Sequence, residues 1–149
     1  LESGFIAGFP IEDLRVTVYD GKSHPVDSKE IAFVAAGRKA FLDALAKARP
    51  AVLEPIVNIE IIAPDMYIGD LTGDLSARRG QVRGTGSPRP GVTSIEAQAP
   101  LAELESFPSR LKALTAGYGS YTLELSHYAP APALLQERLV AAHKPQEEN

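Results

Sequence analysis

Apolar and polar side chains alternate one for one across residues 14–19, as they do in a strand with one buried face. The apolar positions are Leu14, Val16 and Val18. The pair Asp20-Gly21 is a turn signal that closes this segment. The pattern therefore predicts a half-buried strand followed directly by a turn.

Between residues 28 and 48 the apolar spacing changes to that of a helix. The apolar stripe consists of Ile31, Val34, Phe41 and Leu45. Asp27 followed by Glu30 is a capping-box pattern at the start, and Pro50 ends the helix. One strand and one helix leave nothing for the strand to pair with, so residues 1–50 are expected to be the incomplete end of a larger domain.

The pattern restarts at residue 51 and gives the order βαββαβ. The first strand has an apolar face made of Leu53, Val57, Ile59 and Ile61. The first helix is marked by Ile68, Leu71 and Leu75. It ends at Arg78-Arg79, with Gly80 as the expected C-cap. Strands at 81–85 and 92–99 follow, then a helix marked by Phe107, Leu111 and Leu114, then a strand marked by Tyr121, Leu123 and Leu125. This order predicts an α+β, ferredoxin-like sandwich, followed by a short amphipathic tail helix at 133–142.

Composition narrows the classes of function. The chain has 149 residues, 44% of them hydrophobic, which is enough for a real core, and it has no cysteine for disulfides or thiolate metal sites. No apolar run approaches the ~18 residues of a membrane span. The net charge of −4 argues against a general nucleic-acid binder, so any RNA contact must be local.

No catalytic or metal-binding pattern emerges from the sequence. His24, His127 and His143 are scattered, without the spacing of a metal site, and there is no phosphate-binding glycine loop. Asp70 and Asp74 share one helix face, but such pairs are usually structural. No catalytic residue, cofactor or metal is therefore predicted.

Two features remain as candidate binding sites. Arg78, Arg79 and Arg83 form the clearest basic cluster, which favours phosphate contact, although cations at a helix C-terminus also complement its dipole. His24 lies in a turn between the first strand and the first helix, where an ordinary surface histidine and a contact residue are both compatible with the residues alone.

Several ordered motifs resemble one family. The segments "AGFPIEDLRVTVYDGKSHPVDSKEIAFVAAGRKAF", "LEPIVNIEI", "GDLTGDLSARRGQVRG", "APLAEL" and "LTAGYGSYTLELSHY" follow one another as they do at the C-terminal end of translation elongation factor G. The resemblance implies that residues 1–50 are the last part of domain IV and residues 51–149 are domain V. The ending "SYTLELSHYAPAP" resembles the second, paralogous type of this factor.

The resemblance implies a ribosome-binding, non-catalytic fragment of a cytoplasmic, monomeric GTPase that drives translocation. GTP and Mg²⁺ belong to the N-terminal domain of such proteins. The loop Gly21, Lys22, Ser23 and His24 matches the tip that reaches the small-subunit decoding region and the tRNA–mRNA of the A site. Arg78, Arg79 and Arg83 match residues near large-subunit RNA and the region of ribosomal protein L11.

Other functions stay open at this point. Pro25 stands where many family members have an acidic residue, and a paralogue can serve recycling or regulation rather than translocation. A stand-alone βαββαβ module is another alternative. An acylphosphatase-like hydrolase is disfavoured, because such enzymes need an arginine-glycine loop before the first helix, where this chain has Ala63-Pro64-Asp65.

Overall fold

The computed structural model describes residues 4–26 and 28–143 and divides into two compact units. One unit combines the described residues up to Val52 with those from Ala131 onward, and the other is Leu53–Pro130. The tail helix, which the predicted domain V of residues 51–149 includes, thus belongs to the first unit.

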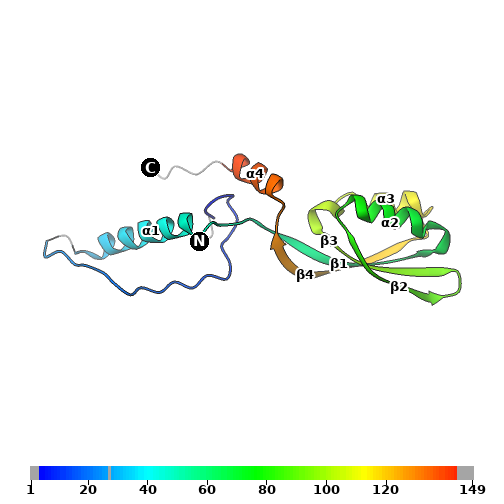
Figure 1. Ribbon diagram of the computed structural model, residues 1–149, viewed down its shortest axis with the longest axis horizontal. Coiled ribbons are helices and arrows are strands. Elements are labelled where there is room, and N and C mark those ends of the chain that lie inside the picture. The colour runs from blue at the N-terminus through cyan, green and yellow to red at the C-terminus, as the bar shows by residue number, and fades with distance from the viewer. Residues whose placement is uncertain (1–3, 27, 144–149) are drawn as a thin grey trace. The chain divides into compact units, whose positions relative to one another are not determined.

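The second unit is a four-stranded antiparallel sheet with two helices on one face (Figure 1). Its strands are β1 (Leu53–Pro64), β2 (Gln81–Arg89), β3 (Val92–Pro100) and β4 (Ser120–Pro130), in the order β2-β3-β1-β4. Its helices are α2 (Ile68–Ala77) and α3 (Phe107–Leu114), each preceded by a 3-10 turn, η1 (Asp65–Tyr67) and η2 (Leu101–Leu104). This order confirms the predicted ferredoxin-like α+β class.

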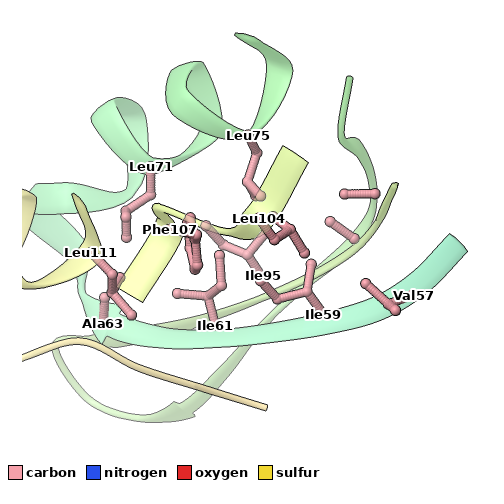
Figure 2. Close-up of a cluster of buried hydrophobic side chains, with 12 residues drawn as sticks. Val57, Ile59, Ile61, Ala63, Leu71, Leu75, Ile95, Leu104, Phe107 and Leu111 are labelled. Atoms are coloured by element: carbon pink, nitrogen blue, oxygen red, sulfur yellow. The ribbon is translucent and has the colours of Figure 1, made fainter. Parts of the chain in front are cut away.

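The core lies between the sheet and the two helices (Figure 2). Alternate residues of β1, among them Ile59 and Ile61, point toward the helices, because side chains in a strand alternate between faces. Leu71 and Leu75 of α2 come down from the helix layer and are fully buried. Phe107 of α3 meets Tyr121 edge to face, with ring centroids 5.4 Å apart. The predicted apolar periods of strands and helices thus meet in one layer.

One position on the predicted apolar face of β1 is exposed instead of buried. Leu53 is 48% exposed, whereas its neighbour Glu54 is only 8% exposed. The pairing of β1 with β4 shifts register between Ile56 and Val57, and the strict alternation of faces is lost across that irregularity. A period of two, counted from the sequence, does not contain this shift.

The last strand is longer and more exposed than predicted. Leu123 and Leu125 pair with Ile59 and Val57 and so face the helix side, yet they are 41% and 56% exposed. The reason is position, because β4 is an edge strand of the sheet.

The predicted strand at 14–19 is wrong, because these residues form no ladder with any described residue. An isolated strand has no partner for its backbone hydrogen bonds, so alternation alone does not make one. Val18 is 86% exposed as a result. The sequence offers residues 14–19 no second strand to pair with, and the described part of this segment contains none. Residues 14–19 therefore form no strand.

The first unit contains α1 (Glu30–Lys47) and α4 (Ala133–Ala142). The α1 helix begins at Glu30 with Lys29 as its N-cap, slightly inside the predicted range, and the predicted cap Asp27 lies outside the described residues. Only Leu45 of α1 is buried. No helix in the described part of the chain is both long and apolar enough to cross a bilayer.

Gln136 of α4 is hydrogen-bonded to the two segments of the first unit that directly precede β1 and follow β4. Its Oε1 accepts a hydrogen bond from Val52 N–H at 3.0 Å, and its Nε2 donates to Ala131 O at 2.7 Å. Ala131 N–H donates to Val52 O at 2.9 Å. One amide side chain therefore satisfies the backbone of both segments where the ladder of β1 and β4 stops.

Candidate nucleic-acid interface

The basic cluster is built on the end of α2. The helix ends at Ala77, and Arg79 adopts the left-handed conformation, with φ of 58°. Arg79 N–H donates to Ser76 O at 3.2 Å, and Gly80 N–H donates to Leu75 O at 2.8 Å. These two bonds are those of a Schellman motif, whose left-handed residue is usually glycine.

The prediction that Gly80 is the C-cap is therefore wrong, because Arg78 is the C-cap and the left-handed residue after it is Arg79. Gly80 is needed for a different reason. A Cβ atom on it would lie 2.7 Å from Leu75 O, which is closer than a real Cβ approaches backbone. Glycine follows the cap because the chain passes close to the last turn of the helix.

The side chain of Arg79 is held by two carboxylates. Its Nη1 and Nη2 donate to Glu54 Oε1 and Oε2 at 2.9 and 2.8 Å, and its Nε donates to Glu103 Oε1 at 3.1 Å. The hydrogen bonds to Glu54, which outweigh partial burial, raise the pKa of the Arg79 guanidinium further above its ordinary value. The side chain remains 35% exposed.

Arg78 is directed into the protein instead. Its side chain is 15% exposed, and its Nε donates to Asp74 Oδ2 at 2.7 Å. Its Nη1 donates to Glu103 O at 2.7 Å and to Ser106 Oγ at 3.1 Å. The guanidinium also lies over the Phe107 ring, 5.7 Å from the centroid. Arg78 thus joins α2 to η2 and to the start of α3.

Asp74 links this arrangement to a basic residue that sequence reasoning missed. Its Oδ1 accepts a hydrogen bond from Arg110 Nε at 3.0 Å, while Oδ2 accepts one from Arg78. Burial acts to raise the pKa of the Asp74 carboxyl, but the hydrogen bonds from Arg78 and Arg110 outweigh it and hold the pKa below its ordinary value. Arg110 lies between the motifs that carry the family resemblance, so none of them indicated it.

Arg83 lies on the other side of the sheet from the helices. It is exposed, and its Nη2 donates to Gln98 Oε1 at 2.8 Å. It lines a hollow of the open sheet face together with three acidic residues, which are Glu60, Glu96 and Glu124. The structure therefore does not bring Arg83 together with the arginines that precede it by only a few residues.

The loop Gly21–His24 belongs to the first unit and is exposed throughout. Asp20 Oδ1 accepts the Gly21 N–H at 2.8 Å. His24 Nδ1 accepts the Val26 N–H at 3.3 Å, and the Ser28 hydroxyl bonds to both the backbone N–H and the carbonyl of His24. Because Nδ1 accepts, the neutral imidazole carries its proton on Nε2. Lys22 and Ser23 are likewise exposed on this loop.

The described residues offer no arrangement for a bound metal. Within residues 4–26 and 28–143, no group of three or more His, Cys, Asp or Glu side chains is placed to hold an ion. His24, Arg79 and Arg83 lie on surfaces rather than in an enclosed cleft. The fold defines a ferredoxin-like α+β domain with an additional helical segment.

The chain belongs to the elongation factor G family. Residues 51–139 match the family described as "Elongation factor G C-terminus", and residues 1–49 match "Elongation factor G, domain IV". A protein of known crystal structure from Thermus thermophilus is 41% identical, with a TM-score of 0.79. That similarity covers 93% of this chain and 21% of that protein, so the chain spans about a fifth of its relative's length.

Proposed function

We propose that this chain is a ribosome-contacting C-terminal part of a translational GTPase and acts in the translocation step of elongation. The observation that carries the proposal is the match of both segments, in order, to elongation factor G families. GTP and Mg²⁺ would be bound by another domain of the parent, which would work as a monomer in the cytoplasm. This chain would contribute binding surfaces and no catalytic group.

The first proposed surface is the loop Gly21–His24, which would reach the decoding region and the tRNA–mRNA of the A site. The assignment of this loop is supported by its exposure and by the hydrogen bonds between the Ser28 hydroxyl and the backbone of His24. With Nδ1 occupied by a backbone N–H, the neutral imidazole of His24 has its donor at Nε2. Such an N–H can donate a hydrogen bond to a phosphate or ribose oxygen, whereas a general base must accept a proton.

The second proposed surface would contact large-subunit RNA near ribosomal protein L11 through two separate basic residues, Arg79 at the end of α2 and Arg83 on the open face of the sheet. Arg79 remains partly exposed although paired, and Arg83 is exposed beside a neutral glutamine. Contact between Arg78 and a phosphate would require its bonds to Asp74 and Glu103 to be exchanged, so its proposed role is to hold the helix end in place. Arginine suits contact with RNA, because its planar guanidinium can stay paired with one carboxylate while its other N–H groups donate to a phosphate.

Ribosome co-sedimentation of the full-length protein, loaded with a non-hydrolysable GTP analogue, tests the second surface. Arg83→Glu and Arg79→Glu should each weaken binding and make it less sensitive to salt, since phosphate contacts release counterions. Arg138→Glu, an exposed charge reversal on α4, is the matched control. If all three variants bind the ribosome as tightly as the unsubstituted protein does, the surface is wrongly assigned.

A role of a second-type paralogue in recycling or regulation is the second candidate. It is favoured by the terminal segment "SYTLELSHYAPAP", most of which forms β4. A single-round translocation assay and a ribosome-splitting assay on the same full-length protein distinguish the two. Splitting without translocation would replace the first proposal.

A further inference from the structure

The two edges of the sheet differ in how they are protected against strand pairing. The β2 edge contains Gly84, Gly86 and Pro88, and its pairing with β3 shifts register at two places. Irregularities and proline of this kind prevent another strand from adding to a sheet. The edge at β2 is therefore closed to a further strand.

The β4 edge has almost none of these features. Its sequence, SYTLELSHYAP, has no glycine, lysine or arginine, and proline occurs only at its last position, Pro130. Its one register shift lies against β1 between Ile56 and Val57, which leaves Ser120–Leu125 regular. Among the described residues, no strand other than β1 pairs with β4. Half of its backbone donors and acceptors thus lack a ladder partner within the described chain.

The two faces of this edge have different chemistry. On the helix side, Leu123 and Leu125 are 41% and 56% exposed in spite of facing the core layer. On the open side, Glu124 lies in the row beside Asn58, and Glu60 pairs directly with Glu96 one row further along. A strand added to β4 would place alternate side chains beside leucines and beside carboxylates.

We infer that β4 receives an extended segment of a partner protein in which apolar and basic residues alternate. The segment would continue the sheet by main-chain hydrogen bonds, which supply affinity, while the alternating side chains supply specificity. Its apolar residues would cover Leu123 and Leu125, and its basic residues would lie next to Glu124 and near Glu60. This inference does not depend on the proposed ribosomal role.

Charge complementarity favours such a partner over a second copy of this chain. Antiparallel pairing of β4 with itself, centred on Glu124, would keep Leu123 beside Leu125 but would set the two Glu124 carboxylates opposite each other. Like charges directly across a ladder are destabilising. Both copies would also bring Glu60 and Glu96 to the same side of the continuous sheet. A basic segment removes this repulsion instead of adding to it.

The test uses the 149-residue chain and a blocked peptide of alternating valine and lysine as the probe. Fluorescence anisotropy should show binding that weakens with salt, and hydrogen exchange should show new protection of alternate β4 amides. Leu125→Lys should weaken binding about tenfold, because it places a cation beside the valines of the probe and removes an apolar pair. Val82→Lys, at a partly exposed site on β2, is the matched control and should leave binding unchanged. Circular dichroism of both variants checks that they are folded.

Two further peptides and one oligomer measurement decide between the alternatives. A valine–glutamate peptide and a valine–lysine peptide with a central proline should both bind much more weakly. Equal binding of the glutamate peptide would overturn the charge argument, and equal binding of the proline peptide would overturn strand addition. Analytical ultracentrifugation that found a dimer with protected β4 amides would assign the edge to a second copy and overturn the partner. Protection confined to β2 would also overturn the inference.

Discussion

Arg79 forms a two-pronged ion pair with Glu54 from a left-handed backbone position at the end of α2. A left-handed arginine costs roughly 1–2 kcal/mol relative to glycine, so the pair must outweigh a backbone penalty. Glu54 is 8% exposed, and both of its carboxylate oxygens accept hydrogen bonds from this guanidinium. The arginine thus neutralises a buried carboxylate from a backbone position that favours glycine.

The first prediction separates the two contributions of Arg79. Arg79→Ala removes the ion pair and keeps the left-handed strain, so it should destabilise the fold by about 1–3 kcal/mol. Arg79→Gly also removes the pair but relieves the strain, so it should cost about 1 kcal/mol less than the alanine variant. Urea unfolding measures both. An alanine variant as stable as the glycine variant would contradict the assigned backbone strain.

The second prediction concerns two glycines of α2 and its end. Gly80→Ala should destabilise by about 1–3 kcal/mol, because its Cβ would lie 2.7 Å from Leu75 O. Gly73→Ala is the matched control, since nothing lies within 4 Å of its Cβ position. In the interior of the helix that change should stabilise by about 0.5–1 kcal/mol. Thermal unfolding should therefore shift in opposite directions for the same chemical substitution.

The third prediction follows from the pKa of Asp74, which is lower in the folded protein than the ordinary value of an aspartate. A carboxyl with a lowered folded pKa adds stability above its unfolded pKa and loses it as the pH falls through the folded value. Melting temperature should therefore drop below about pH 4, and Asp74→Asn should flatten that drop. Asp43→Asn, which removes an exposed pair with Lys47, should leave the acid limb unchanged. A parallel acid limb for the Asp74 variant would refute this assignment.

The fourth prediction concerns the amide of Gln136. Gln136→Met keeps the length of the side chain but leaves Val52 N–H and Ala131 O without this partner, at a cost of about 1–3 kcal/mol. Amides of α4 should exchange faster with solvent, while β1 and β3 amides keep their protection. Glu137→Met, an exposed neighbour, serves as control. Uniform loss of protection through the second unit would show that the effect is not local.

The fifth prediction tests the loop at His24 in the full-length protein. His24→Ala should slow the ribosomal step while leaving GTP hydrolysis and the melting temperature intact, because it removes a surface donor and no core contact. Ser28→Ala should slow the same step less, since it loosens the backbone of His24 and keeps the imidazole. Stopped-flow translocation kinetics measure both. Unchanged rates for His24→Ala would make it an ordinary surface histidine.

The order of strands and helices could be predicted because the apolar periods of the second unit are set by one shared core. Ile61 and Leu75 could be placed from spacing alone, and both are fully buried. The prediction of a strand at 14–19 was wrong because the described residues contain no strand that pairs with this segment. Periodicity reports which face is apolar, and pairing decides whether a strand exists.

The site was predicted less completely, because it depends on contacts between distant residues. Arg78 and Arg79 are adjacent in the sequence, but Glu54 and Glu103 come from β1 and η2. Asp74, four residues before Arg78, is an acidic partner that does lie near the two arginines in the sequence. No local motif contains Glu54 or Glu103, so the pairing of Arg79 could not be predicted. Arg110 was missed for the same reason, because only the fold sets it beside Asp74.

Because these arginines are paired with carboxylates, their formal charges overstate the positive field that they present to a ligand. Each cation that already holds a carboxylate has little uncompensated field to offer a phosphate. The salt dependence of the proposed RNA contact at this helix end should then report fewer ionic contacts than its formal positive charge. A chain with a net charge of −4 can therefore approach a polyanion at a point whose basic residues serve first as internal counterions.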